Sequence, residues 1–531
     1  MPEQPGVGPD AGADGPVGDE TSFDVVVLGG GVAGLVAARR LAHLGNRVLV
    51  VEQRESLGGF VATQVVAGIR LDSGAESFAT RKGTVAALAV ELGLGDSVVQ
   101  PDPAGAWVAW DGGSAPLPAA GLLGIPGVPL ADDVRRIIGW RGSLRAYLDR
   151  LMPLLRVRPE TDLGDIVRRR MGQRVLDRLV TPVVAGVHSA DPSVVDVQTV
   201  APGLTQAMTT QGSLSGAVMA LREQAPAGTR VQGIEGGMYR LVEALEEDCR
   251  LYGVEFRTAT RVDAVRRADA SAASAAGRAA GADAAPWVVE TSAAGSGAGA
   301  RGPERFAARA IVVATGFRPG LGLLADAGVA AAAAAPETWP QPSSVTIATV
   351  VIDEARLDAH PRGTGVLVAE GTPGVRAKAL THSSAKWRWL ADSLPAHRHV
   401  VRLSYGRRDG ASASRAPGLD RVRVDRAGLG QPAVDQETVL RDASTLLGVP
   451  LSAADVAGFA VVPWSDSLAF ATVGHKARVR TVLAEVAEVP ALDVVGAWVS
   501  GTGLAATVEH AEGVASGLAA ELRGAPRLDG A

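Results

Sequence analysis

A glycine-rich loop between two apolar runs constrains the fold of this chain more than any other feature. Residues 24–28 (DVVVL) are almost entirely apolar and predict a buried strand. Residues 32–44 place apolar side chains at the helical period, and residues 47–52 form a second apolar run. A strand, a helix and a strand in this order form a βαβ unit with parallel strands. The sequence therefore predicts an α/β fold that begins with a Rossmann-like nucleotide-binding domain.

The loop carries the pattern Gly29-x-Gly31-x-x-Gly34 in the strand-to-helix context that a dinucleotide-binding fingerprint requires. We expect Gly29 to permit the tight turn, Gly31 to admit a diphosphate and Gly34 to allow close helix packing. The helix N-terminus offers unpaired N–H groups and a partial positive charge to the phosphates. Glu52, at the end of the second strand, is placed to accept hydrogen bonds from ribose hydroxyls. A purely structural glycine turn is the alternative.

A second glycine pair, Gly58 and Gly59, follows in EQRESLGGF. The pair resembles the flavoprotein family that includes amine oxidases, phytoene desaturases and protoporphyrinogen oxidases, and it implies FAD lying extended through the domain. Two further segments resemble this family: IVVATG (311–316), near the adenylate, and GAWVSGTGL (496–504), which would place a helix N-terminus against the isoalloxazine ring. No second GxGxxG follows a strand, so we expect no NAD(P)H site and electrons that pass from the substrate to oxygen.

Six segments in chain order resemble one branch of this family, the bacterial coproporphyrinogen and protoporphyrinogen oxidases of haem synthesis. They are LDSGAESFATRK (71–82), WVAWDGGSAPLPAAGLLGIP (107–126), the helical stretch 163–202, GIEGGMYRLVEAL (233–245), LTHSSAKWRW (380–389) and WSDSLAFATVGH (464–475). Each alone is a weak signal, but six in the right order are a strong one. The resemblance implies a discontinuous FAD domain, a mixed-sheet substrate domain and a helical domain, which meets the bilayer in membrane-attached relatives.

The resemblance also assigns candidate site residues. Those for FAD are Gly29, Gly30, Gly31, Val32, Ala33, Gly34, Glu52, Gly58, Gly59, Gly74, Ala75, Glu76, Ser77, Val262, Trp464, Gly501, Thr502, Gly503 and Leu504. Those for the substrate carboxylates are Arg81, Lys82 and Lys386, with Arg388 as a further option. For each of these basic residues a solvated surface charge is the alternative.

The chain departs from the family pattern at several positions near the expected pocket. The departures are Ala75 in place of proline, His188 in place of tyrosine, Ala469, Phe470 and Ala471 in place of Pro-Gln-Tyr, and GLAATVEHA (503–511) in place of a Gly-Ile-Pro-x-Cys-Ile-like end. The last two lie near the flavin ring in the family. These changes leave the prediction of FAD intact and make the substrate less certain.

The reaction implied by the resemblance removes six electrons from a porphyrinogen in three two-electron steps, with O₂ as acceptor and hydrogen peroxide as by-product. Hydride loss from an electron-rich macrocycle gives a delocalised cation, so a dedicated base is not demanded and we assign none. His475 and His382 are candidates for such a base, with a structural role as the alternative for both. His397 and His399 lack further clustered ligands, so we expect no metal site.

The 531 residues are too many for one compact core, so several domains are expected. The expected parts are a disordered tail (1–22), an FAD-binding domain in three segments (23–96, 236–318 and 483–522), a helical region with a hairpin (97–235) and a substrate-binding domain (319–482). Residues 131–225 are expected to be mainly helical, with VRRRMGQR (167–174) as a solvent-exposed helix face rather than an anion site. Residues 254–268 and 492–499 each predict a single strand. Residues 293–305 (AAGSGAGARGPER) are expected to form a solvated loop, because no apolar strand runs directly into their glycines and no helix follows.

Composition excludes several classes of function. A net charge of −5 argues against nucleic-acid binding. One cysteine, Cys249, permits no intramolecular disulfide and indicates a reducing cytoplasm. Its position on an apolar helix face predicts a small core residue, with a redox role as the alternative. We expect no transmembrane helix, and the sequence leaves open an apolar face that lies in a membrane interface.

The leading interpretation is a cytoplasmic FAD oxidase that converts coproporphyrinogen III to coproporphyrin III with O₂. Protoporphyrinogen IX oxidase, an amine oxidase or desaturase-like flavoprotein, and a non-catalytic flavin-binding protein are the alternatives. Contacts with other enzymes of haem synthesis stay open. The sequence does not determine the preference between the two porphyrinogens or the oligomeric state.

Overall fold

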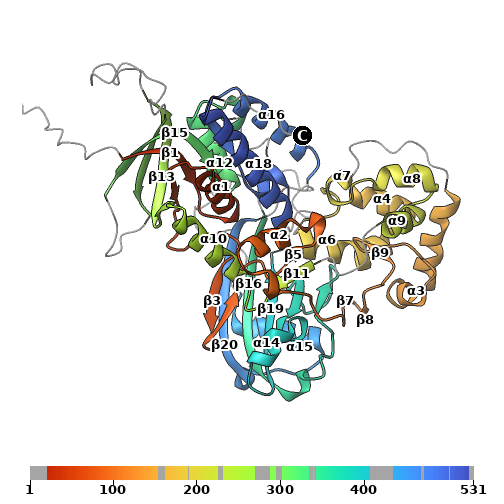
Figure 1. The fold of residues 1–531 in the computed structure, drawn as a ribbon. Coiled ribbons are helices and arrows are strands. Elements are labelled where there is room, and N and C mark those ends of the chain that lie inside the picture. The colour runs from red at the N-terminus through yellow and green to blue at the C-terminus, as the bar shows by residue number, and fades with distance from the viewer. Residues whose placement is uncertain are drawn as a thin grey trace, which may run out of the picture.

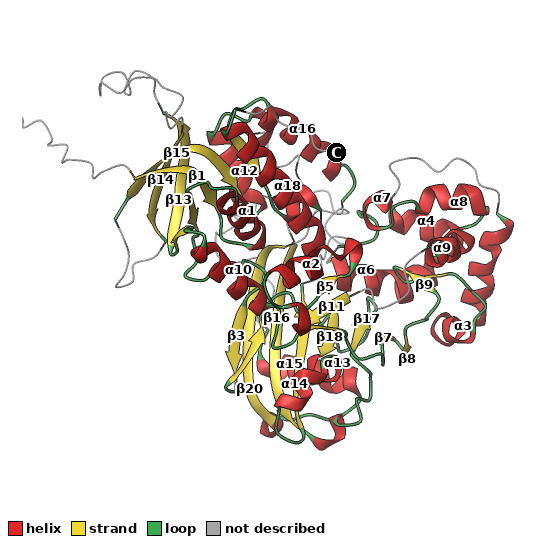
Figure 2. Ribbon diagram, viewed as in Figure 1, coloured by secondary structure: helices red, strands yellow, loops and turns green. Residues whose placement is uncertain are grey.

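The computed structural model describes residues 21–152, 162–188, 190–224, 231–268, 287–294, 302–333, 339, 343–406, 434–467, 472–501 and 503–524. Within these ranges the chain forms two large sheets with covering helices and a lobe of helices to one side of them (Figure 1 and Figure 2). This arrangement confirms the predicted α/β class, with a Rossmann-like sheet, a mixed second sheet and a helical part.

The first sheet gathers seven strands in the order β12-β2-β1-β15-β14-β13, with β21 beside β15. The strands are β1 (Thr21–Leu28), β2 (Val48–Val51), β12 (Glu255–Arg257), β13 (Thr260–Arg267), β14 (Trp287–Ala293), β15 (Glu304–Val313) and β21 (Leu492–Val494). β1 pairs parallel with β2 and with β15, and β2 with β12 and β15 with β21 also pair parallel. β14 pairs antiparallel with both β13 and β15. β1 begins at Thr21, before the expected end of the tail, because its first residues pair with β15.

Helices cover both faces of this sheet. α1 (Val32–His43), α10 (Tyr239–Leu251) and α18 (Leu504–Leu522) share a core with Val25 and Val27 of β1. α12 (Phe317–Asp326) and α16 (His475–Ala487) share a second core with Val26 and Leu28. Successive side chains of a strand point to opposite faces, so a strand covered on both sides is apolar throughout. This is the reason that the first βαβ unit was recognisable.

The second sheet is mixed, in the order β20-β16-β19-β18-β17-β7-β8. Its strands are β7 (Ala106–Trp110), β8 (Gly113–Pro116), β16 (Ser343–Asp353), β17 (Gly365–Val368), β18 (Ala379–His382), β19 (Arg398–Tyr405) and β20 (Val456–Ser467). β7 and β8 form the predicted hairpin around Asp111, Gly112 and Gly113. α15 (Gln436–Leu447) packs on one face, and α14 (Arg388–Ser393) with the hairpin β3 (Thr63–Val66) and β4 (Ile69–Asp72) packs on the other.

The helical lobe confirms the prediction for residues 131–225. Its helices are α3 (Asp132–Tyr147), α4 (Leu163–Met171), α5 (Gln173–Val175), α6 (Thr181–His188), α7 (Val197–Val200), α8 (Leu204–Gln211) and α9 (Leu214–Glu223). They enclose a core of their own that includes Ile137, Val167 and Leu214. None of the helices in the described ranges combines the length and hydrophobicity needed to cross a membrane.

Two predicted strands are wrong in detail. The segment 254–268 is two strands, because Ala259 adopts a left-handed φ of 51° and turns the chain from β12, beside β2, to β13, beside β14. The run predicted as one strand up to Val499 ends as β21, and Ala497–Ser500 is a helical turn (α17). Gly496, at φ 136°, makes the turn between them. Local sequence could not locate these breaks, because Thr258 and Thr260, which favour strands, flank the first, and the apolar Val495 and Ala497 flank the second.

Candidate functional site

The glycine loop lies where β1 ends and α1 begins. Gly29 has a φ of 113°, and a Cβ added there would stand 2.7 Å from the carbonyl oxygen of Ala314. A Cβ at Gly34 would overlap the carbonyl oxygen of Gly29, so helix and strand meet at backbone contact. Gly31 differs, because its nearest neighbour would be Gly59 Cα at 4.0 Å. Two of the three glycines therefore serve packing, and the third leaves space beside the backbone.

The second glycine pair forms the opposite wall of this space. The Gly58 N–H donates to the Gly30 carbonyl at 2.8 Å. Gly58 and Gly59 have φ values of 103° and 62°, which side chains rarely adopt. A Cβ at Gly59 would stand 3.2 Å from Gly31 Cα. The two glycine segments are thus held together by backbone contacts, with a narrow gap beside Gly31.

The start of α1 suits an anion. The helix has no acidic residue in its first turn, and no side chain caps its N-terminus at Gly31. Its first N–H groups therefore present a partial positive charge that no carboxylate of the first turn neutralises. The residues present fit a dinucleotide diphosphate at this loop.

Glu52 is fixed at the end of β2. Its Oε2 accepts from the Gly30 N–H at 2.7 Å, and its Oε1 accepts from the Arg54 N–H at 2.9 Å. A carboxylate has about four lone-pair sites, so capacity remains for ribose hydroxyls. Glu52 both braces the glycine loop and presents an acceptor beside it.

The predicted FAD-contacting segment 74–77, here called the 74–77 box, lies between the glycine-pair segment and the second sheet. A Cβ at Gly74 would overlap the Phe60 carbonyl oxygen, and the Ala75 N–H donates to that oxygen at 2.9 Å. Trp464 of β20 is buried, donates from Nε1 to the Ser73 carbonyl at 3.0 Å and packs its ring 5.3 Å from that of Phe60. The box is therefore held to the glycine-pair segment on one side and to the second sheet on the other.

Glu76 is the centre of a charge cluster that is half-buried between the two sheets' segments. Its Oε1 accepts from Lys386 Nζ at 2.6 Å, and its Oε2 accepts from Arg402 Nη1 at 2.7 Å. Ser383 donates to the same Oε2 at 3.2 Å. Burial opposes ionisation, but Lys386 and Arg402 outweigh it and lower the pKa of Glu76 to about 2. Lys386, proposed as a substrate contact, thus has its charge engaged by Glu76.

Arg402 is a residue that sequence reasoning missed. Its Nη2 donates to the Gly74 carbonyl at 2.6 Å, and its side chain is 9% exposed. A neighbour in the cluster is Asp72, whose pKa is raised to about 6 by burial, against hydrogen bonds from the Met238 and Tyr239 N–H groups. The available signal was a lone arginine inside the apolar run HVVRLSY.

The C-terminal glycines lie where the chain enters α18. Gly501 and Gly503 have φ values of 98° and 105°, and a Cβ at either would meet no heavy atom within 4 Å. α18 begins at Leu504, directly after these glycines and three residues before Thr507, where the sequence pattern predicts the helix to start. Thr502, Ala469, Phe470 and Ala471 lie outside the described residues, and Val262 is half-buried in β13.

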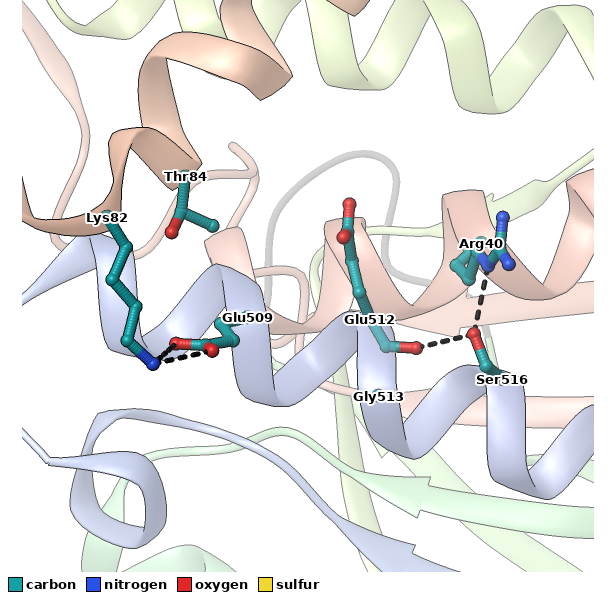
Figure 3. A pocket seen from close by; sticks show the side chains of 7 residues that line it. All are labelled: Arg40, Lys82, Thr84, Glu509, Glu512, Gly513 and Ser516. Atoms are coloured by element: carbon teal, nitrogen blue, oxygen red, sulfur yellow. Dashed lines mark hydrogen bonds and ion pairs between the residues drawn. The ribbon is translucent and has the colours of Figure 1, made fainter. Parts of the chain in front are cut away.

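Two of the other basic candidates, Lys82 and Arg388, lie on the surface. Lys82 Nζ bonds Glu509 of α18 at 2.8 Å, on an open cavity of about 600 Å³ that Arg40, Glu512 and Ser516 also line (Figure 3). The Arg388 side chain is 91% exposed and pairs with Asp392. Arg81 begins a short helical turn next to Lys82, and its side chain is not among those described. His188 ends α6, and its side chain is likewise not described.

The histidine candidates are buried. His475 donates from Nε2 to the Trp498 carbonyl at 2.8 Å among the rings of Phe317, Trp339 and Trp498, and burial lowers its pKa. His382 shares a hydrogen bond of 3.2 Å with His399. Burial, aided by His399, lowers the pKa of His382 to about 3 and keeps it neutral. The described residues contain no group of histidines, cysteines and carboxylates arranged to hold a metal ion.

Comparison with known proteins identifies the family. The profile of flavin-containing amine oxidoreductases matches residues 32–321, which begins just after Gly31 and includes Gly34, the glycine pair and the charge cluster's Glu76. The chain belongs to the flavin-containing amine oxidoreductase family. It is therefore an FAD-dependent oxidoreductase.

Relatives within this family carry tetrapyrrole-pathway names. A curated coproporphyrinogen III oxidase of Mycobacterium leprae is 28% identical over 512 residues, covering 94% of this chain and 99% of that protein. A chloroplastic protoporphyrinogen oxidase of rice is 35% identical over 208 residues, or 38% of this chain and 37% of that protein. A solved Exiguobacterium structure, provisionally named a protoporphyrinogen oxidase, superposes with a TM-score of 0.73 at 25% identity, covering 95% of this chain and 99% of that one.

Proposed function

We propose that this flavoprotein oxidises coproporphyrinogen III to coproporphyrin III, with O₂ as acceptor and hydrogen peroxide as by-product. The observation that carries the proposal is the length of the match to the Mycobacterium leprae coproporphyrinogen III oxidase, which reaches 99% of that protein. Loss of six electrons to three O₂ molecules gives three molecules of hydrogen peroxide for each porphyrin.

Within this proposal, the chain's residues bind FAD and orient the segments around it. Gly31 and the start of α1 would hold the FAD diphosphate, and Glu52 would accept from the adenosine ribose. The bound flavin supplies a two-electron acceptor. The cluster of Glu76, Lys386 and Arg402 would fix the 74–77 box against the second sheet. The histidines that the sequence offered as bases are neutral and buried in their surroundings, so no proton transfer is assigned to them.

We also propose the three-part division of the cofactor domain. Its sheet takes β1 and β2 from segment 23–96, β12–β15 from 236–318 and β21 from 483–522. The mixed sheet takes most of its strands from segment 319–482 and would form the substrate-binding domain. The hairpin β7–β8 joins that sheet from the 97–235 segment.

Protoporphyrinogen IX is the second candidate substrate. It is favoured by the 35% identity to the rice protoporphyrinogen oxidase, although this match covers 38% of the chain. The two substrates differ in charge, with four propionates against two, so basic side chains at the pocket would decide between them.

The test supplies each porphyrinogen in air to the flavin-loaded protein and follows porphyrin fluorescence and peroxide. The proposal expects a larger kcat/KM for coproporphyrinogen III and three peroxides per porphyrin. A preference for protoporphyrinogen IX would support the second candidate. A yellow protein that produces neither porphyrin would contradict both, and peroxide formed from amines instead would indicate an amine oxidase.

A further inference from the structure

Four of the chain's eight histidines meet at one end of the second sheet. The group, here called the histidine corner, comprises His360, His382, His397 and His399 together with Asp358. Asp358 Oδ2 accepts from His397 Nδ1 at 2.7 Å, and its Oδ1 accepts from His399 Nε2 at 3.0 Å. His399 Nδ1 and His382 Nε2 share a hydrogen bond of 3.2 Å. Hydrogen bonds therefore lead from a carboxylate that is 46% exposed to an imidazole that is fully buried.

The direction of these bonds leaves one buried ring nitrogen without a partner. Because His399 donates from Nε2 to a carboxylate, its Nδ1 is the acceptor of the neutral ring, and His382 Nε2 donates to it. His382 Nδ1 is then the unprotonated nitrogen, and it has no hydrogen-bond partner among the described residues. The His360 ring lies edge-on to the His382 ring at 5.3 Å. A proton added at Nδ1 would be buried beside other imidazoles.

The charged groups around the corner are already paired. On the flanking segments they are Asp353 with Arg398, Glu354 with Arg356, Lys386 with Glu76, and Arg362, which stacks 4.7 Å above the Trp107 ring. Asp358 contacts His397 and His399 and does not contact His382. Burial, aided by His399 and His360, lowers the pKa of His382 to about 3. Burial also lowers the pKa of His399, although Asp358 opposes the shift.

The histidine corner adjoins the contacts that hold the 74–77 box. His382 ends β18 and directly precedes the helical turn α13 (Ser383–Lys386). From this turn Ser383 donates to Glu76 Oε2 at 3.2 Å, and Lys386 donates to Glu76 Oε1 at 2.6 Å. Arg402, the other cation on Glu76, lies on β19 three residues after His399. A displacement at the corner would therefore act on both cations that fix Glu76.

Acid favours an open form of this corner over the closed form. An imidazole in water takes up a proton near pH 6.5, whereas His382 in the closed corner stays neutral down to about pH 3. The neutral, buried ring thus contributes stability that is complete above pH 6.5 and is lost as the pH falls toward 3. For this one group, each pH unit below 6.5 raises the equilibrium constant for opening about tenfold.

We propose that the histidine corner is an acid-sensitive switch for cofactor retention. In mild acid the corner opens and takes up protons, α13 moves away from Glu76, and the 74–77 box separates from the second sheet and releases FAD. The switch acts above pH 4.5, where Glu76 remains ionised. Asp72 acts in the opposite direction, because its protonation below about pH 6 favours the folded state. The proposal depends on FAD binding and is independent of which substrate the protein oxidises.

The experiment uses the full-length, flavin-loaded protein at about pH 7.5 and about pH 5.5. It records site-resolved hydrogen exchange as protection factors, and released FAD by its fluorescence. In the parent, protection across residues 379–393 should fall about tenfold more than protection in α15, on the other face of the same sheet. FAD release at the lower pH should rise by a similar factor.

Two variants and a control isolate the histidine. His382→Phe and His382→Gln cannot take up a proton, so protection across residues 379–393 should fall less than about threefold in both, and both should retain more FAD than the parent at the lower pH. His43→Gln removes a half-buried histidine that pairs with Asp248 on α10, and it should respond to acid as the parent does. His475 and His510 are also buried with lowered pKa values, but they lie on α16 and α18, so site-resolved exchange separates their effect.

Three results would overturn the proposal. The first is parent protection across residues 379–393 that falls no more than that of α15, a comparison that needs no variant to fold. The second is FAD held as firmly at the lower pH as at the higher one while protection at the corner falls, since the corner would then not control the cofactor. The third is a folded His382→Phe or His382→Gln protein that keeps the parent's response to acid.

Discussion

At the scale of single residues, the three fingerprint glycines separate into two kinds. Gly29 and Gly34 face backbone atoms at overlapping distance, so the fold itself requires them. Gly31 has a φ of −70°, which any residue adopts, and faces open space. We therefore expect the fold to tolerate a side chain at Gly31 and the proposed diphosphate contact to be lost.

Gly31→Val should therefore yield a folded protein that lacks flavin. The valine fills the gap beside Gly59, where the diphosphate would lie, and raises the Kd for FAD by more than about a hundredfold, which corresponds to roughly 3 kcal/mol. Gly34→Val should instead fail to accumulate as folded protein. Flavin absorbance per chain and far-ultraviolet circular dichroism measure the two outcomes, with Gly517→Ala on α18, where a Cβ meets nothing within 4 Å, as control. Stoichiometric flavin in Gly31→Val would contradict the placement.

Glu76 is a residue whose ionisation stabilises the fold. Its folded pKa is about 2, below the ordinary 4.5, because Lys386 and Arg402 offset the effect of burial. A carboxyl with a lowered pKa contributes stability that is complete above 4.5 and is lost as the pH falls toward 2. Asp72 acts oppositely: its raised pKa of about 6 means that protonation below that value favours the folded state.

Glu76→Gln should lower the free energy of unfolding by about 3 kcal/mol at pH 7, because the buried Arg402 and the half-buried Lys386 lose the anion between them. The difference from the parent should narrow as the pH falls from 4.5 toward 2, where the parent carboxyl is protonated too. Urea unfolding at several pH values measures both effects. Glu243→Gln, which removes an exposed pair with Arg70, should cost less than about 1 kcal/mol. A difference that is constant with pH would show that the ion pairs do not cause the loss.

At the scale of elements, one buried carboxylate links three helices of the helical lobe to one another. Asp149, in the turn after α3, accepts from Arg170 Nε of α4 at 2.6 Å. It also accepts from the N–H groups of Leu214 and Ser215, at the start of α9, at 3.1 and 2.8 Å. Three helices thus meet at one side chain that is fully buried.

Asp149→Asn should destabilise the lobe by about 3 kcal/mol, because it removes the Asp149 carboxylate charge from its 2.6 Å contact with the buried Arg170 guanidinium. Hydrogen exchange should increase in α3, α4 and α9 more than in the two sheets. Glu246→Gln, which removes an exposed pair with Arg250 one turn away on α10, should cost about 0.5 kcal/mol or less. Equal exchange in the lobe of parent and variant would contradict the joining role.

The same elements show what sequence could and could not predict. The βαβ unit, the hairpin and the helical stretch follow from local patterns and are present as predicted. The run VRRRMGQR was expected to be a wet helix face, and Arg168 and Arg169 are exposed, but Arg170 is buried. Asp149, a hydrogen-bond partner of Arg170, is 21 positions away in the sequence, and Arg402, a partner of Glu76, is 326 positions away. Pairs of this kind depend on how the elements pack, which no local pattern records.

At the scale of the whole molecule, three distant segments close one sheet around the proposed cofactor site. β15 pairs with β1 on one side and with β21 on the other, so the sheet needs both ends of the chain. α1, at the fingerprint, and α18, after the last glycines, share one core. A ligand that contacts segments from both ends favours the folded chain over any partly folded one.

Removing FAD should therefore lower the stability of the whole first domain, and restoring it should recover that stability by mass action. At a free FAD concentration about a hundredfold above its Kd, the gain is about 2.7 kcal/mol, and the melting temperature should keep rising with further FAD. FMN lacks the adenylate and one phosphate. At the same concentration it should stabilise the apoprotein much less than FAD does if most of the binding energy comes from contacts with the diphosphate between Gly31 and Gly59. Calorimetric melting of the apoprotein with each flavin measures this, and Gly31→Val, which keeps the fold, should show no response to FAD. Equal stabilisation by FMN and FAD would place the decisive contacts at the ring instead, near Gly501 and Gly503, and would contradict the assignment of the diphosphate to the N-terminal loop.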